Sequence, residues 1–272
     1  MPTSVPRLTA MALRRLLARF RKASVLVIGD LMLDEFVWGR VSRISPEAPV
    51  PVVWVQSESI MPGGAANVAN NFRALGGQVR LAGLIGTDRW GSLLLAELQR
   101  RHIDTRGVLR DASRPTTVKT RVIAHHQQVV RVDREEKTAL PISMIARVID
   151  AVRRQLDEVD AVIIEDYGKG LITRQLLEAI IPAAHAHHRL ITVDPKEEHF
   201  ELYRRVTAIT PNRFEAGEML GRELETEEAV IKGGQELLGR LECEAVLITM
   251  GEDGMCLFER GGRQTRIPTV AQ

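Results

Sequence analysis

Short apolar runs alternate with longer segments of helical periodicity along most of the chain. The runs are almost continuous in Val, Ile, Leu and Ala, as in parallel strands covered on both faces. They lie at residues 25–29, 79–85, 161–164, 190–193 and 245–248. The helical patterns lie at residues 65–75, 90–101, 142–156, 173–184 and 227–241. This alternation predicts an α/β fold with a doubly wound, mainly parallel sheet and helices on both faces.

Two stretches break this rhythm and predict a small β lid. Residues 35–55 are rich in Val and Trp and contain three prolines, and residues 116–133 alternate apolar with polar side chains. Because proline is tolerated at sheet edges, we expect the two stretches to pair with each other outside the main sheet. Ahead of the first strand, Leu13, Leu16, Leu17 and Phe20 form one apolar face of a helix, which we expect to pack on the sheet.

The composition agrees with one large α/β core. The chain has 272 residues, of which 44% are hydrophobic, so we expect residues 1–272 to form a single domain. The 37 basic and 35 acidic side chains nearly balance, which argues against a nucleic-acid partner. No apolar run reaches the roughly 18 residues of a membrane span. Cys243 and Cys256 have no CxxC spacing and are expected to be reduced thiols, as in a cytoplasmic protein.

Polar, acidic and glycine residues follow each apolar run. Ligands of open α/β sheets bind beyond the carboxyl ends of the strands, so these positions are the first candidates for a site. They are Asp30 and Asp34, followed by residues 86–88, 165–170, 194–196 and 249–251.

The most specific motif is Pro62-Gly-Gly-Ala-Ala-Asn-Val-Ala69, followed by Gly76 and Gly86. Two glycines before a helix let the backbone approach a ligand, and the first helical N–H groups are free donors. The glycine pair alone would also suit an ordinary turn. The whole spaced pattern, however, resembles the first signature of the PfkB carbohydrate kinases of the ribokinase superfamily.

Four further segments resemble the bacterial D-glycero-β-D-manno-heptose-7-phosphate kinases. They are residues 29–39, 42–52, 127–133 and 166–170, and the string SRISPEAPVPV at 42–52 is the most diagnostic. The resemblance implies a ribokinase-like fold. It also implies transfer of the ATP γ-phosphate, with Mg²⁺, to the anomeric hydroxyl of a heptose 7-phosphate, on the way to ADP-heptose for lipopolysaccharide. Two alternatives stay open: a PfkB-family kinase for another sugar or sugar phosphate, and a non-catalytic sugar- or nucleotide-binding protein.

The resemblance also implies which residues bind the sugar phosphate. Asp34 would hold sugar hydroxyls, because a carboxylate accepts two hydroxyl protons, and Asn67 can both donate and accept. Asp30 has the alternative role of capping a turn. The implied sugar-side residues are Asp34, Gly63, Gly64 and Asn67, and the implied ligands of the distal phosphate are Arg131 and Lys169.

The resemblance implies that ATP binds at an Asn-x-x-Glu element and at the turn after residue 248, which together form the nucleotide side of the site. Mg²⁺ prefers oxygen ligands and retains water, so Asn212 and Glu215 would organise the metal and the ATP phosphates. The same two residues also predict a helix start with a capping box, and the two roles are compatible. The implied nucleotide-side residues are Asn212, Arg213, Phe214, Glu215, Thr249 and Gly251.

The general base of this superfamily lies in a Gly-Ala-Gly-Asp motif, which does not occur between Met1 and Gln272. We therefore expect a kinase domain that is incomplete at its C-terminus and inactive as given, with the motif following Gln272. If that expectation is wrong, Asp166 and Asp194 are the alternative bases. Exposed strand edges often pair between subunits, so we also expect a homodimer through the lid strands.

Overall fold

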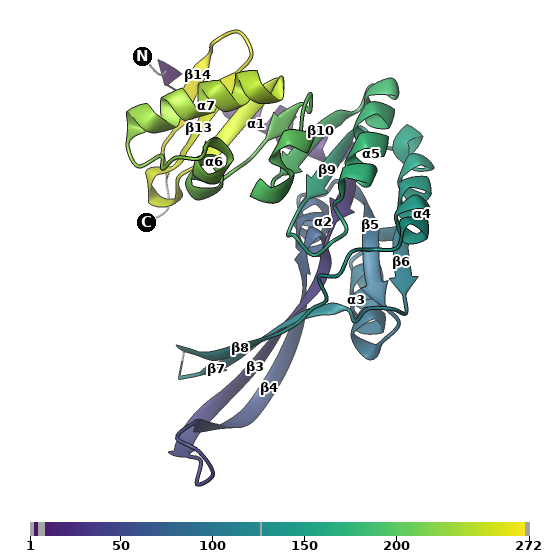
Figure 1. The fold of residues 1–272 in the computed structure, drawn as a ribbon, viewed down its shortest axis with the longest axis vertical. Coiled ribbons are helices and arrows are strands. Elements are labelled where there is room, and N and C mark those ends of the chain that lie inside the picture. Colours follow the sequence, from purple (N-terminus) through teal and green to yellow (C-terminus); the bar gives the residue numbers. More distant parts are fainter. Residues whose placement is uncertain (1–2, 5–8, 126, 270–272) are drawn as a thin grey trace.

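The computed structural model describes residues 3–4, 9–125 and 127–269, which form two sheets (Figure 1). Neighbouring strands of the main sheet are parallel except at β13, which runs antiparallel to both β12 and β14. The predicted α/β fold with a mainly parallel sheet is confirmed, and the five predicted strands are β2, β5, β9, β10 and β12. The spatial order is β1 (Thr3–Ser4), β14 (Gln264–Ile267), β13 (Met255–Glu259), β12 (Ala245–Thr249), β11 (Ala208–Ile209), β10 (Leu190–Asp194), β9 (Ala161–Glu165), β2 (Ser24–Gly29), β5 (Gln78–Gly86) and β6 (Asp104–Asp111).

Helices pack on both faces of this sheet, as the alternation predicts. Successive side chains of a strand point to opposite faces. In β2, Leu26 and Ile28 therefore join one apolar cluster, whereas Val25 and Val27 join the other. One face carries α2 (Ala65–Ala74) and α3 (Arg89–Arg100); the other carries α4 (Ile142–Arg153), α5 (Arg174–Ala186), α6 (Arg213–Leu220) and α7 (Glu227–Leu241). Short 3-10 helices are η1 (Leu156–Glu158), η2 (Glu197–Leu202) and η3 (Gly251–Asp253).

The second sheet is the lid, and it extends away from the main sheet (Figure 1). Strand β3 is antiparallel to β4 and parallel to β7, so the two predicted lid stretches pair with each other, as expected. Leu33 and Val118 anchor the lid in the apolar cluster of α2 and α3. The strands are longer than predicted, and Asp34 lies within the lid rather than just past a main-sheet strand. In spatial order the lid strands are β4 (Pro51–Gly64), β3 (Leu31–Ile44), β7 (Thr117–Ala124) and β8 (Gln127–Arg134).

Helix α1 (Ala10–Phe20) forms where its periodicity predicts a helix, but its expected packing on the sheet is wrong. Leu13, Leu16 and Leu17 are 45%, 42% and 49% exposed, and none of them belongs to either apolar cluster. Periodicity depends on the local sequence, whereas packing depends on a neighbour that periodicity does not reveal. Among residues 9–125 and 127–269, no helix is long and apolar enough to cross a lipid bilayer.

Candidate active site

The sugar-side residues gather where the lid leaves the main sheet. Gly63 on β4 lies against Asp34 on β3, and a Cβ atom at Gly63 would come within 2.4 Å of the Asp34 Oδ2. Gly64 has a φ of +55°, and a Cβ there would lie 2.5 Å from the Asp30 carbonyl oxygen. Gly64 therefore requires glycine, whereas a side chain at position 63 would displace the Asp34 carboxylate. Asn67 lies in the first turn of α2 with an exposed side chain.

Asp34 has a cationic partner that the sequence analysis did not select. Its Oδ1 forms an ion pair with Arg121 on β7, whose guanidinium lies 5.5 Å from the ring centroid of Phe36. Arg131 on β8 is the cross-strand partner of Arg121 and so shares its face of the lid. The side chain of Arg131 is half exposed and hydrogen-bonds to Asp133 at 2.9 Å. The structure therefore places both arginines on the face of the lid that carries Asp34.

Asp30 caps the loop between β9 and α5. It is 4% exposed, and its carboxylate accepts hydrogen bonds from the backbone N–H groups of Tyr167 and Lys169 at 3.0 Å and of Leu171 at 3.2 Å. Three such bonds use most of its accepting capacity. This geometry favours the turn-capping alternative over a ligand role for Asp30.

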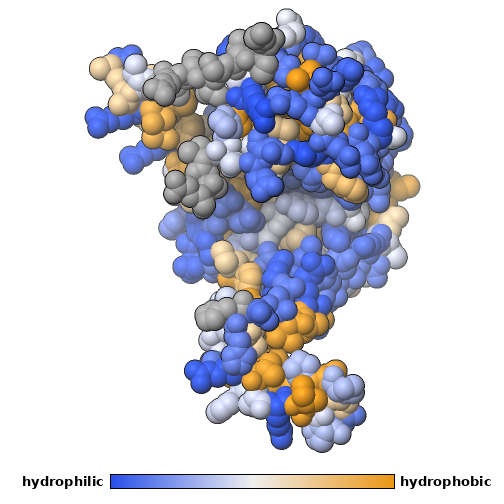
Figure 2. All heavy atoms as spheres, turned by 90° about the vertical axis from the view of Figure 1, so that its left-hand side faces the viewer, coloured by the Kyte–Doolittle hydropathy of each residue, from blue (hydrophilic) through white to orange (hydrophobic). Residues whose placement is uncertain are grey.

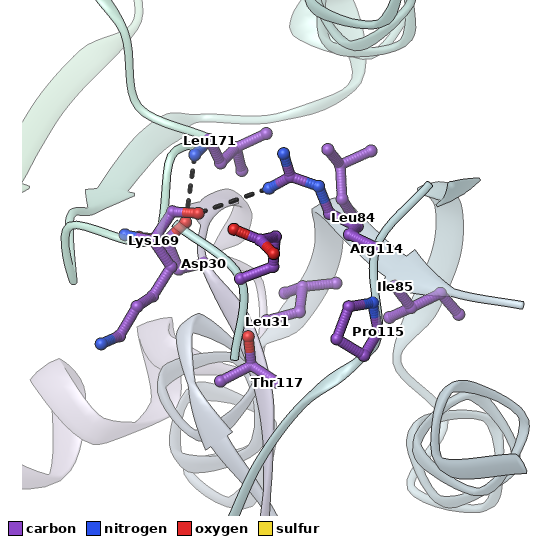
Figure 3. A pocket seen from close by; sticks show the side chains of 10 residues that line it. Asp30, Leu31, Leu84, Ile85, Arg114, Pro115, Thr117, Lys169 and Leu171 are labelled. Atoms are coloured by element: carbon purple, nitrogen blue, oxygen red, sulfur yellow. Dashed lines mark hydrogen bonds between the residues drawn. The ribbon is translucent and has the colours of Figure 1, made fainter. Parts of the chain in front are cut away.

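Lys169, the predicted phosphate ligand, forms an ion pair with a residue at the end of the lid. Its Nζ lies 2.7 Å from Oε2 of Glu135, which follows β8. Burial raises the pKa of Glu135, but the Lys169 ammonium and the nearby Lys137 outweigh burial, so the pKa is lowered overall. Arg114 donates to the carbonyl oxygens of Thr138 at 2.9 Å and Lys169 at 3.5 Å. Figure 3 shows the Lys169 side chain directed away from Arg114 while its carbonyl faces it.

The pocket in Figure 3 is not the sugar site. Its volume is about 20 Å³, which admits a water molecule and excludes a sugar. Asp30, Arg114 and Lys169 line it together with Leu84 and Pro115.

Asp166, one of the two alternative bases, is occupied by structural contacts. It is 5% exposed, and Oδ2 accepts the Tyr203 hydroxyl at 2.5 Å and lies 2.5 Å from Nδ1 of His199. Oδ1 accepts the backbone N–H of Gly168 at 2.9 Å. These contacts hold the loop in place and favour a structural role for Asp166.

The nucleotide-side residues meet at the start of α6 and the end of β12. Asn212 is the N-cap of α6 and forms the predicted capping box with Glu215, with hydrogen bonds of 2.8 and 2.9 Å. A β-bridge joins Asn212 to Thr249, which brings the two motifs side by side. Gly251 is exposed with a φ of +59°. The other two predicted nucleotide-side residues are not joined to this group by a hydrogen bond. Arg213 forms an ion pair with Asp253, and the side chain of Phe214 is 72% exposed.

Acidic side chains lie at the carboxyl ends of the main-sheet strands, between the sugar-side residues and the nucleotide-side residues. Glu165 and Asp194 are register partners on β9 and β10, and Glu165 is 5% exposed. Burial and the charge of Asp194 raise the pKa of Glu165 to about 8, and burial and the charge of Glu215 raise that of Asp194 to about 6. Burial contributes most to both pKa shifts, and the like charge of a neighbouring carboxylate adds to it. The sequence predicted these strand ends as candidate site positions, but it did not predict the electrostatic interaction between Glu165 and Asp194.

Residues 22–272 match the pfkB family of carbohydrate kinases. The chain belongs to this family. Among its relatives are proteins named bifunctional protein HldE: that of Geotalea uraniireducens is 43% identical over 257 residues, which are 94% of this chain and 52% of the relative. That of Helicobacter pylori strain G27 is 41% identical over 91% of this chain and 53% of the relative. The chain thus spans about half the length of these relatives.

Solved structures support the fold of this pfkB-family chain. Phosphofructokinase-2 from Escherichia coli, in complex with substrates and products, superposes with a TM-score of 0.72 over 92% of this chain and 80% of that chain. The sequence identity is 18%, so the similarity concerns the fold alone. Membership of the pfkB family makes the chain a carbohydrate kinase.

Proposed function

We propose that this chain carries the substrate-binding part of a kinase that transfers the γ-phosphate of ATP to the anomeric hydroxyl of D-glycero-D-manno-heptose 7-phosphate, in the synthesis of ADP-heptose for lipopolysaccharide. The string at residues 42–52 and the 41–43% identity to HldE proteins support this choice within the family. Asp34 on the sugar side and Glu215 on the nucleotide side both contribute, after burial and the charges of Glu165 and Asp194, to the raised pKa of Tyr167, which supports a site shared by the two sides.

Each side chain would have a defined task in this reaction. Asp34, held by Arg121, would accept hydrogen bonds from sugar hydroxyls, and the exposed Asn67 would add a donor and an acceptor. Lys169 and Arg131 would bind the distal phosphate. Catalysis of phosphoryl transfer consists mainly of such positioning and of charge stabilisation.

The acidic edge suits Mg²⁺ bound with ATP. Its donors are carboxylate and amide oxygens, which Mg²⁺ prefers. Within the described ranges, no group of three or more His, Cys, Asp or Glu side chains is arranged to hold a metal by itself. Asn212 and Glu215 would therefore hold the ion through water and the ATP phosphates. When bound, Mg²⁺ would neutralise charge on the β- and γ-phosphates.

The lid is our proposed site of homodimer formation. Its strands expose large apolar side chains, which gather along the lower part of Figure 2. Exposed apolar side chains are common at interaction sites, and an uncovered strand edge favours pairing with another chain. The exposed residues are Trp38 at 41%, Ile44 at 61%, Trp54 at 71%, Val130 at 47% and Val132 at 55%.

A substrate profile tests the proposed function. The full-length protein is assayed with ATP and Mg²⁺ against heptose 7-phosphate, fructose 6-phosphate and unphosphorylated heptose, and the product is identified by phosphorus NMR. We expect kcat/KM for heptose 7-phosphate to exceed the others by about 100-fold or more, since a bound phosphate contributes charged hydrogen bonds. Preference for fructose 6-phosphate would favour another sugar substrate, and absence of transfer to any sugar would favour a binding protein.

A further inference from the structure

Arg114 lies between the main sheet and the lid, in the connection from β6 to β7. Its side chain is 10% exposed, and its Nε lies 3.3 Å from Oδ2 of Asp111, the last residue of β6. The Asp111 side chain is 6% exposed, and Oδ1 accepts hydrogen bonds from the backbone N–H and the hydroxyl of Ser113 at 2.9 and 2.7 Å. A buried carboxylate at the end of a main-sheet strand therefore holds the guanidinium in place.

The other two nitrogens of the guanidinium contact two segments that are far apart in the sequence. Nη2 donates to the carbonyl oxygen of Thr138, in the segment that follows lid strand β8, at 2.9 Å, and Nη1 donates to that of Lys169 at a longer 3.5 Å. Gly170 allows this approach: its φ is +94°, and a Cβ there would lie 3.4 Å from the Thr138 oxygen and 3.7 Å from Nη1. Arg114 therefore links the main sheet, the end of the lid and the loop between β9 and α5.

These contacts hold Lys169 from both sides of its backbone. Its N–H donates to the buried Asp30 at 3.0 Å, and its carbonyl oxygen faces Arg114, with the lysine side chain directed away from the guanidinium (Figure 3). The ammonium lies 2.7 Å from Glu135, three residues before Thr138. The segment after β8 thus contacts the head of Lys169 directly and its backbone through Arg114.

Arg114 is placed to hold Lys169 rather than to bind a sugar phosphate itself. Each of its three guanidinium nitrogens faces a protein oxygen. The cavity beside it has a volume of about 20 Å³, enough for a water molecule and too small for a sugar phosphate. The planar fork of arginine can bridge several oxygens in one fixed geometry, which the single head group of a lysine cannot do.

We propose that Arg114 is a positioning residue that orients Lys169 toward the distal phosphate of the substrate, and that it thereby favours phosphorylated over unphosphorylated sugars. This rests on the proposed function, in which Lys169 binds that phosphate. A cation whose backbone is fixed in advance loses less freedom on binding than a mobile one, so it binds its anion more tightly. The effect of Arg114 on the phosphate should therefore require Lys169.

A double-mutant cycle in the full-length protein tests this requirement. Because removal of Arg114 alone would leave Asp111 buried without a counter-charge, every variant of the cycle carries Asp111→Asn, whose amide oxygen can still accept from Ser113. In this background Arg114→Met should raise KM for the sugar phosphate about 5- to 10-fold and leave KM for ATP and for the unphosphorylated sugar within about twofold. In the presence of Lys169→Ala, Arg114→Met should change KM for the sugar phosphate by less than about twofold.

Arg110→Ala is the matched control, because Arg110 lies on β6, is exposed and donates to Ser92 at 3.3 Å; its KM values should match those of wild type. Three results would overturn the proposal: an unchanged KM in Arg114→Met, an equal increase with and without Lys169, or a common increase for ATP and both sugars, which would indicate a general structural role. An unchanged KM in Lys169→Ala would overturn it together with the phosphate role of Lys169.

The assay uses whichever sugar phosphate the wild-type protein turns over best, with its unphosphorylated counterpart. The substrate profile of the wild-type protein decides the identity of the sugar, and the cycle decides the role of Arg114. The choice of heptose 7-phosphate can therefore fail while the role of Arg114 is still decided.

Discussion

Lys169 and Glu135 form an ion pair of 2.7 Å that joins the loop between β9 and α5 to the end of the lid. Both side chains are largely buried, with 15% and 17% exposed. The glycines on either side of Lys169 have φ values of +64° and +94°, which glycine adopts without strain. A substrate phosphate that binds the lysine must therefore compete with the Glu135 carboxylate.

We predict that Lys169→Ala raises KM for heptose 7-phosphate about 10- to 100-fold and leaves that for unphosphorylated heptose within about twofold, since the lysine serves the phosphate. Glu135→Gln should lower KM for the phosphorylated sugar by about fivefold, because it removes the competing charge. Lys137→Ala is the matched control, because Lys137 also faces Glu135, at 3.4 Å, but is 66% exposed. Equal changes for both sugars would exclude Lys169 as the phosphate ligand.

The sequence predicts contacts of this site well where the interacting residues are close together along the chain, and poorly where they are far apart along it. The capping box at Asn212 and Glu215 was predicted correctly, because all its atoms come from four consecutive residues. The partnership of Asp34 with Arg121 joins residues 87 positions apart and depends on lid register. A pattern of polar and apolar residues fixes the face of a strand but not the neighbour across it.

The elements of the fold were likewise predicted where the local sequence determines them, and missed where it does not. The covered strands β2, β5 and β9 have nearly continuous apolar sequences and were predicted, whereas β6 was missed because charged residues interrupt it. The exposed face of α1 was also missed, since an apolar stripe predicts burial without identifying what buries it.

Asp34→Asn should raise KM for the sugar and lower kcat, together costing about 1.5–3 kcal/mol of transition-state stabilisation, while the fold stays intact. The amide keeps the shape of the carboxylate but loses the charge that Arg121 and the sugar hydroxyls recognise. Steady-state kinetics with heptose 7-phosphate measure the effect. Glu58→Gln, at an exposed position of the same lid, serves as control. Wild-type kinetics in Asp34→Asn would remove Asp34 from the sugar site.

Stability should fall as pH rises, because of Glu165. Its folded-state pKa of about 8 lies above the ordinary 4.5, so the folded protein keeps a proton that the unfolded chain releases between those values. The contribution of Glu165 to the free energy of unfolding is therefore complete below about pH 4.5 and is lost as pH rises through about 8.

Glu165→Gln should remove this dependence. The Tm of Glu165→Gln minus the Tm of wild type should increase on the order of 5 °C when the pH is raised from 5 to 8. This follows from about 1.4 kcal/mol per unit of pKa shift and from partial relaxation of the structure. Thermal unfolding at both pH values measures the difference. Glu178→Gln, on the exposed surface of α5, is the control and should follow the wild-type curve. Parallel curves for wild type and Glu165→Gln would show that Glu165 is not protonated in the folded state.

Trp54→Arg should convert the proposed dimer to a monomer. Trp54 is 71% exposed on β4, and a charge there could not be buried against a second lid. Light scattering after size-exclusion chromatography gives the mass of both proteins. Leu75→Ser changes an apolar residue that is 59% exposed at the end of α2, away from the lid, and should keep the wild-type mass. A monomeric wild type, or a dimeric Trp54→Arg, would contradict the lid interface.

Asn212 has two possible roles, capping α6 and binding the ATP phosphates, and one substitution separates them. Serine is as good an N-cap as asparagine, so Asn212→Ser should keep the capping box with Glu215 and leave Tm within about 2 °C of wild type. Its shorter side chain would not reach the phosphates or their water, so KM for ATP should rise about tenfold.

Thr173→Ala provides the opposite case. Thr173 caps α5 through a 3.2 Å hydrogen bond to the N–H of Leu176 and does not belong to the nucleotide side, so its loss should cost about 1 kcal/mol of stability without changing KM for ATP. Thermal unfolding and ATP kinetics on both variants form the measurement. If Asn212→Ser keeps both wild-type Tm and wild-type KM, then Asn212 serves α6 alone. The nucleotide side of the site would in that case depend on Glu215, Thr249 and Gly251.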